Sequence, residues 1–158
     1  MNLIVKQKFS LGFAKFEIYN ENEEIVYTAE AKFSFGGRLI LYNTFGAELG
    51  VVKGVPFSFL PRYEIYKEDV FLGSVRKKFS FFKPFFEIDY NGWTLEGSFS
   101  ELEYRLNAPD GSPVASISRK AFSWTDRYFV SIHDDRSVIE ILLIILCLDE
   151  DRERSQRN

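Results

Sequence analysis

The most reactive side chains in this sequence are one histidine and one cysteine. His133 precedes Asp134 and Asp135, an arrangement that suits a general base or a metal ligand. The sequence has no second histidine, and no set of cysteines, to complete a zinc site. We therefore interpret residues 133–135 as a strand end followed by acids that cap a helix, and we predict no metal site.

Cys147 lies inside the apolar run of residues 138–148, in which Glu140 is the one polar residue. An apolar environment raises the pKa of a thiol and hides it, so we predict a core residue rather than a nucleophile. A single cysteine precludes a disulfide within the chain, which favours a reducing compartment such as the cytoplasm. No Ser-His-Asp order, nucleophile elbow or phosphate-binding loop is present. We predict neither enzymatic activity nor a cofactor, with an enzyme that uses a surface cleft as the alternative.

Two short basic runs are the leading candidates for a binding site. Arg76, Lys77 and Lys78 correspond to Arg119 and Lys120 in a second copy of the same sequence pattern. Cations gathered on one surface attract anionic lipid headgroups or an acidic protein. Cations at strand ends also prevent aggregation between sheet edges, and this alternative explanation stays open. Three further cations would extend such a surface: Lys83, Arg38 and Arg127.

Residues 79–86 read Phe-Ser-Phe-Phe-Lys-Pro-Phe-Phe. Strict alternation along a strand cannot place all five of these aromatic rings inward. Two explanations remain: some rings insert at an interface, or the loop folds over the end of the domain and buries them.

These candidates need a framework, and its central element is the run of residues 138–148. A helix that is apolar on all sides lies in a protein core or in a membrane. Eleven residues rise only about 16 Å, roughly half of a bilayer's hydrocarbon thickness, so we predict a helix enclosed by protein. Ser137 and Glu140 fit a capping box at its start. We expect one domain over residues 1–150, with this helix at about 137–150 and a polar tail at 151–158. No residue after Leu148 is apolar, so we expect the chain to leave the core there and enter solvent.

The chain before Ser137 alternates apolar and polar residues with period two, broken by turn signals such as Asn91-Gly92. This pattern, with 17 Phe, 8 Tyr and 2 Trp, predicts about twelve short antiparallel strands. A closed barrel of that size is too wide for its own side chains to fill, so the helix should occupy the lumen and exclude a small-molecule ligand. Four small residues would let the wall approach the helix: Ala29, Ala31, Gly73 and Ala115.

A short motif recurs along the predicted strands. A basic residue is followed by Phe-Ser in four segments, which begin at Lys8-Phe9-Ser10, Lys32-Phe33-Ser34, Lys78-Phe79-Ser80 and Lys120-Ala121-Phe122-Ser123. Such repetition indicates a repeated hairpin unit, which fits a sheet that closes on itself.

The strand Tyr63-Glu64-Ile65-Tyr66, the return strand of residues 72–78 and the terminal apolar helix together resemble the LURP-one-related family. The resemblance covers residues 1–150 and implies the tubby C-terminal-like fold, a twelve-stranded barrel around a C-terminal helix. Tubby proteins, which are similar in fold, bind phosphoinositides through basic residues on the barrel wall. No motif here allows those lipid-contacting residues to be transferred one by one.

The functional expectation is a non-enzymatic intracellular binding module that docks anionic headgroups or an acidic partner on its outer wall. A protein-interaction scaffold without lipid binding is the second alternative. The net charge of −3 and the pI of about 5.3 argue against a nucleic-acid partner. The N-terminus lacks the order of a signal peptide, so we expect a cytoplasmic protein, at most peripheral at a membrane.

Overall fold

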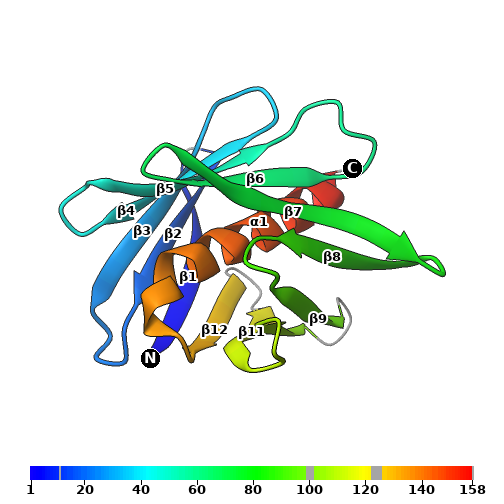
Figure 1. The fold of residues 1–158 in the computed structure, drawn as a ribbon. Helices are drawn as coiled ribbons and strands as arrows, with labels where there is room; N and C mark the ends of the chain where they lie inside the picture. Colours follow the sequence, from blue (N-terminus) through cyan, green and yellow to red (C-terminus); the bar gives the residue numbers. More distant parts are fainter. Residues whose placement is uncertain (11, 99–101, 122–125, 158) are drawn as a thin grey trace.

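The fold is a nearly closed barrel of twelve antiparallel strands with one helix inside it, as the sequence predicts (Figure 1). This computed structural model describes residues 1–10, 12–98, 102–121 and 126–157. The strands are β1 (Asn2–Ser10), β2 (Phe13–Tyr19), β3 (Ile25–Lys32), β4 (Arg38–Asn43), β5 (Glu48–Gly54), β6 (Arg62–Lys67), β7 (Val70–Ser80), β8 (Lys83–Asp89), β9 (Thr94–Ser98), β10 (Glu103–Asn107), β11 (Pro113–Ala121) and β12 (Asp126–Ile132). A 3₁₀ turn, η1 (Asp135–Ser137), leads into the helix α1 (Val138–Arg157).

Strands that are consecutive in the chain pair with one another, except β8 and β9, and β1 also pairs with β12. The strand order therefore runs from β8 through β1 and β12 to β9, with β8 and β9 at the two edges. Since the strands alternate in direction, the connections that follow odd-numbered strands gather at one end of the barrel. We call this end the rim, and the opposite end the base.

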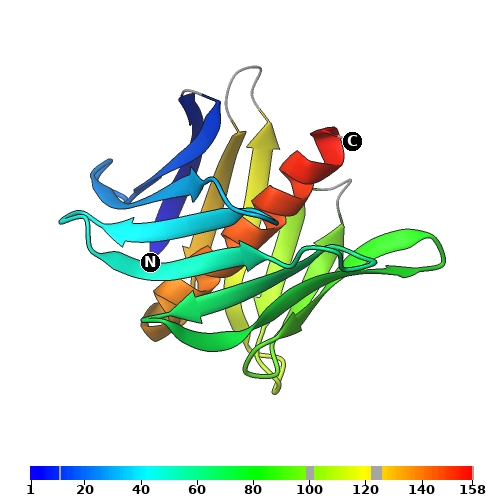
Figure 2. The same ribbon diagram turned by 90° about the horizontal axis from the view of Figure 1, so that it is seen from above.

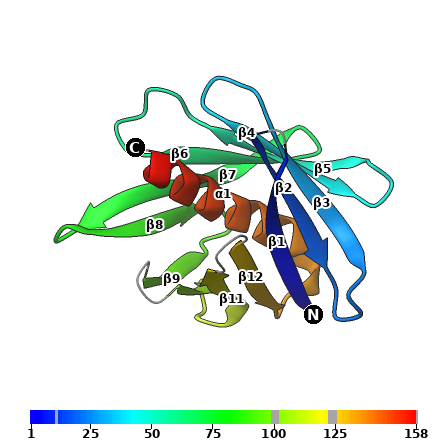
Figure 3. The same ribbon diagram turned by 180° about the vertical axis from the view of Figure 1, so that it is seen from behind.

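The helix α1 runs along the inside of the curved sheet from the base to the rim (Figures 2 and 3). Its residues 141–148 are all buried, including Cys147. Alternate residues of the strands face it, for example Phe16 and Ile18 on β2 and Ile117 on β11. Period-two alternation thus produces one apolar inner surface, and the helix fills the space that this surface encloses.

Both ends of α1 differ from the prediction. The predicted capping box is wrong: the Ser137 hydroxyl donates to Asp134, and Glu140 forms an ion pair with Lys67 on β6 at 2.7 Å. The cap is Asp134 itself, whose carboxylate accepts from the backbone N–H of Arg136. The expectation that the chain after Leu148 leaves the core is also wrong. The helix continues to Arg157, and Asp149 and Asp151 are 1% and 0% exposed.

The small residues on the wall act differently from one another. A Cβ on Gly73 would lie 1.9 Å from the carbonyl oxygen of Asp89, so this glycine allows close approach of β8 rather than of the helix. Gly50 on β5 is the glycine that faces α1, since a Cβ there would lie 2.9 Å from Leu143 Cδ1. Within the described residues, α1 falls short of the length and apolarity that a membrane-crossing helix requires.

Candidate binding surface at the rim of the barrel

The five predicted binding residues divide between the inside and the outside of the barrel. Lys77 and Arg119, which are equivalent in the sequence repeat, point inward at the last turns of α1. Lys77 Nζ lies 2.9 Å from Asp151 Oδ2, and an Arg119 NH2 group lies 3.0 Å from Asp126. Lys77 therefore pairs with a buried acid of the helix, whereas Arg119 acts through Asp126 on β12, which also pairs with Arg152 of the helix.

The other three predicted cations face outward. Lys78 pairs with Glu87 at 2.7 Å, Lys120 lies over the ring of Phe129, and Arg76 Nε donates to Ser74. Because β8, β9 and β10 lie between β7 and β11, Lys78 and Lys120 are at least about 19 Å apart along the wall. The basic runs thus occupy equivalent places near the rim without forming one contiguous patch.

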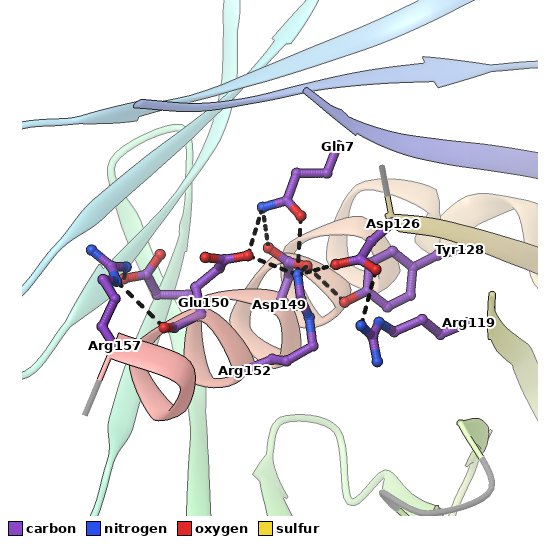
Figure 4. Close-up of polar contacts among 9 residues, drawn as sticks. Gln7, Arg119, Asp126, Tyr128, Asp149, Glu150, Arg152 and Arg157 are labelled. Carbon is purple, nitrogen blue, oxygen red and sulfur yellow. Dashed lines mark hydrogen bonds and ion pairs between the residues drawn. The ribbon is translucent and has the colours of Figure 1, made fainter. Parts of the chain in front are cut away.

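A buried polar network fixes the end of α1 under the rim (Figure 4). The Asp149 carboxylate accepts from the Tyr128 hydroxyl at 2.7 Å and from Gln7 Nε2 at 3.2 Å. Arg152 lies 3.0 Å from Asp149 and 2.6 Å from Asp126, which also receives Arg119. A buried charge is stable when it is paired and hydrogen-bonded, and every acid of this network meets both conditions.

Burial sets the protonation of these groups. It raises the pKa of the Asp149 carboxyl, and the adjacent Arg152 opposes that rise. Burial and the nearby Asp149 raise the pKa of the Tyr128 hydroxyl, and burial and Asp151 do the same for Tyr63. Both tyrosines therefore remain neutral hydrogen-bond donors to carboxylates of the helix.

Cys147 is expected to be unreactive in the folded protein, because burial raises the pKa of its thiol and removes reagent access. Ellman's reagent should label it only when denaturant unfolds the barrel. Rapid labelling in buffer would contradict the enclosed position of this residue.

The rim carries most of the exposed phenylalanines. Six described rings that are at least 73% exposed lie in three rim connections: Phe33, Phe35, Phe57, Phe59, Phe81 and Phe82. We call this set the phenylalanine rim. The base has one comparably exposed ring, Phe45, at 93%. The prediction left open whether residues 79–86 insert or are buried by a folded loop; Phe81 and Phe82 protrude at the tip of the β7–β8 hairpin, whereas Phe86 is buried.

The sequence motif explains part of this placement. Among the described residues, basic-Phe-Ser segments lie at the rim ends of β3 and β7, so the motif places Phe33 in the phenylalanine rim and Phe79 next to the β7–β8 tip. Sequence reasoning missed Phe57-Ser58, which follows β5 without a basic residue directly before it. A further Phe-Ser at 99–100, and that at 122–123, follow β9 and β11 but lie outside the described residues. Phe-Ser therefore recurs near the end of every odd-numbered strand, a signal that the sequence does contain.

The hairpin tip of Phe81 and Phe82 is strained. Their φ angles are +49° and +65°, in the left-handed region that bulky residues avoid. A two-residue hairpin loop of this type favours Asn-Gly; the chain uses that pair at Asn91-Gly92 on the base, in a turn between β8 and β9, which do not pair with each other. Two phenylalanines at the tip therefore oppose folding, and this strain points to a role other than stabilising the fold.

Replacing the tip by Phe81→Asn with Phe82→Gly is expected to stabilise the fold. Relief of left-handed strain is worth about 1–2 kcal/mol per residue, which for two residues predicts a rise in melting temperature of about 4–16 °C. Thermal denaturation measured by circular dichroism tests this. Phe45→Asn removes an equally exposed ring with an ordinary φ and should leave the melting temperature nearly unchanged; equal shifts in both variants would argue against strain at the tip.

Charge is layered below the phenylalanine rim. The three connections at 33–37, 55–61 and 81–82 contain no charged residue. Three lysines near the rim each form an ion pair with a glutamate that lies two residues nearer the base on the same or the adjacent strand. The pairs are Lys8 with Glu17, Lys32 with Glu30 and Lys78 with Glu87. Phenylalanines, cations and then acids thus follow one another down the outer wall.

The base is acidic in contrast. Its connections and the turn into α1 hold eight acids: Glu21, Glu23, Glu24, Glu68, Asp69, Asp110, Asp134 and Asp135. His133 lies exposed at this end, and its backbone N–H bonds to the carbonyl of Val114. Among the described residues, no group of three potential ligands is arranged to hold a metal ion.

A cleft of about 570 Å³ opens at the rim beside the end of α1. Phe13 and Phe33 form its apolar side. Its charged lining consists of four cations and two acids: Lys32, Arg38, Arg154, Arg157, Glu150 and Glu153. Arg154 donates to the carbonyl of Gly36 at 2.6 Å and so ties the 33–37 connection to the helix. In the part of the chain that is described, the buried Nε of Arg38 has no hydrogen-bond partner.

A second cleft, of about 580 Å³, crosses the outer face of β1, β12, β11 and β10. Serines at 116, 118 and 131 lie along it, and Glu21, Glu23 and Glu103 give it an acidic border with Arg105. This acidic lining does not suit an anionic ligand, so the rim cleft is the better candidate.

Comparison with known proteins agrees with this architecture. The model of the LURP-one-related family matches residues 1–149. The chain is 32% identical over 151 residues to the uncharacterized protein YxjI of Bacillus subtilis (strain 168), covering 94% of this chain and 92% of that protein. A solved X-ray structure of a protein from Arabidopsis thaliana superposes with a TM-score of 0.59 at 16% identity, over 92% of this chain and 89% of the other, which confirms the fold. The expected resemblance is therefore confirmed, and the chain belongs to the LURP-one-related family.

Proposed function

We propose that this protein is a non-enzymatic module that docks on anionic phospholipid surfaces, with the rim of its barrel facing the headgroups. The observation that carries the proposal is the opposite character of the two ends. The rim combines cations with three uncharged connections, whereas the base holds eight acids. Near an anionic surface this distribution orients the rim toward the lipid and the base away from it.

The proposal keeps three of the five predicted binding residues: Arg76, Lys78 and Lys120. Lys77 and Arg119 are assigned to holding α1, because both pair with acids beside or on the helix. The rim cleft supplies a place for a headgroup phosphate, since its lining has an excess of two cations and an arginine donor left over on Arg38. Arginine is well suited to phosphate because its planar fork presents several donors at once.

Co-sedimentation with vesicles of phosphatidylcholine, with and without phosphatidylserine, tests the proposal. We expect binding only to the anionic vesicles, weakening as salt is added. Reversing the charge by Lys78→Glu with Lys120→Glu should weaken binding by at least about thirtyfold, since loss of each lysine near the surface costs about 1 kcal/mol and each new carboxylate is repelled by the anionic lipid. Both side chains face outward, so the fold should be retained, as circular dichroism would verify.

A matched control makes the same change of charge elsewhere. Arg105→Glu with Arg136→Glu alters one cation on the outer wall and one near the start of α1, away from the rim. This control should bind nearly as wild type does. Equal weakening by both double variants would mean that binding depends on the net charge of the protein and not on the position of the lysines. Absence of wild-type binding to anionic vesicles would refute the proposal.

A further inference from the structure

We infer that the phenylalanine rim inserts into the hydrocarbon of the bilayer and anchors the barrel there. This inference rests on the proposed function and adds an apolar component to it. Six of the seven most exposed phenylalanines among the described residues lie at this end, above a layer of lysines. Rings at hydrocarbon depth with cations at headgroup depth are the arrangement of an interfacial anchor.

Contacts between two of the rim connections fix their conformation, so their phenylalanine rings point into solvent and do not fold back onto the barrel. The rings of Phe35 and Phe57 lie 5.2 Å apart and link the 33–37 and 55–61 connections. The backbone N–H of Gly54 bonds to the carbonyl of Gly37 at 2.9 Å. A Cβ on Gly36 would lie 2.5 Å from the carbonyl oxygen of Gly54, so only glycine allows this approach.

The β7–β8 hairpin supplies the most direct argument. Phe82 is 100% exposed and Phe81 93%, and both occupy left-handed backbone where Asn-Gly would fold better. Exposure and strain together disfavour a role in the core. A bilayer accepts such rings without a complementary pocket. This suits rings that lie on different connections around the rim.

A bilayer is favoured over a protein partner by charge as well. An anionic membrane meets the lysine layer while the tips pass below the headgroups, and the acidic base stays in water. In two of the three connections a serine separates the phenylalanines, as in Phe33-Ser34-Phe35 and Phe57-Ser58-Phe59. Apart from the contact between Phe35 and Phe57, the exposed rings lie on different connections and do not form the continuous packed surface typical of a protein interface.

A probe attached to one tip tests insertion. Cys147 is buried and is the single cysteine of the sequence, so Phe82→Cys gives one reactive thiol for an environment-sensitive nitrobenzoxadiazole dye. With phosphatidylserine-containing vesicles, the dye at 82 should shift to shorter wavelength and be quenched by lipids brominated on the acyl chain. Phe45→Cys, labelled in the same way on the base, should show neither change.

The hairpin variant Phe81→Asn with Phe82→Gly complements the probe. It should lose at least about tenfold in vesicle binding, and its remaining binding should be more sensitive to salt, because two of the six rings are gone and the charged component carries a larger share. Phe45→Asn should bind as wild type does. The hairpin variant is expected to be more stable than wild type, so weaker binding could not be attributed to unfolding.

The outcomes separate the two proposals. Vesicle binding with an unshifted dye at 82 would overturn insertion while leaving headgroup docking intact. No binding by wild type would refute the docking function and the inference with it. A stable dimer that the hairpin variant dissociates would assign the rim to a second copy of the chain and overturn the lipid anchor.

Discussion

A chain that ends before Ser137 is expected to lose cooperative folding altogether. Residues 141–148 are buried on every side of the helix, and their enclosure contributes roughly 12–24 kcal/mol before entropy at about 1.5–3 kcal/mol per side chain. This gross contribution exceeds the net stability of about 5–15 kcal/mol of a typical domain. The strands would be left around an empty apolar lumen.

Thermal denaturation and size-exclusion chromatography would measure the effect. We expect aggregates and no sharp transition from the truncated chain. A matched control ends after Arg154, which removes only the last turn and retains the buried acids Asp149 and Asp151. A soluble truncated chain that melts sharply would show that the barrel closes without its helix and would contradict the packing described above.

Arg152→Met is expected to produce the largest effect of any single substitution discussed here. Arg152 neutralises Asp149, which is 1% exposed, and Asp126 beside it. Removing one partner of a buried ion pair costs about 3–5 kcal/mol, because the remaining charge stays unsolvated. At about 2–4 °C per kcal/mol, the melting temperature should fall by roughly 6–20 °C.

The loss of stability caused by Arg152→Met should depend on pH, and the direction of that dependence can be stated. Burial already raises the pKa of Asp149, and loss of Arg152 raises it further. An acid with a raised pKa in the folded state favours folding at low pH, and that advantage is lost as the pH rises through the folded pKa. The gap between wild type and variant should therefore be larger at about pH 7 than at about pH 5.

Arg157→Met serves as the control on the same helix. Its guanidinium is 68% exposed and lies 3.8 Å from Glu150, a surface pair of the kind worth about 0–1 kcal/mol. It should change the melting temperature little. A comparable loss of stability in both variants, or a gap independent of pH, would show that the buried network is not the cause.

The sequence alone determined the layout of the fold. Period-two alternation assigns each strand residue to one face, and the all-apolar run of residues 138–148 requires a protein enclosure. A barrel of twelve strands follows because so many strands need a common apolar partner. The Phe-Ser recurrence also identifies the rim, once the alternating direction of antiparallel strands is taken into account.

The tertiary structure alone decided the roles of the charged residues. Lys77 and Lys78 are adjacent in sequence, yet one meets Asp151 inside and the other meets Glu87 outside. Alternation shows that they face opposite ways but not what each one meets, and Asp151 lies 74 residues further along the chain. From the sequence, Asp149 and Asp151 are predicted to lie in a solvated tail, because burial of an acid is favourable only when it has hydrogen-bonding or charged partners. Those partners lie on strands far away in sequence: Gln7, Tyr63, Lys77 and Tyr128.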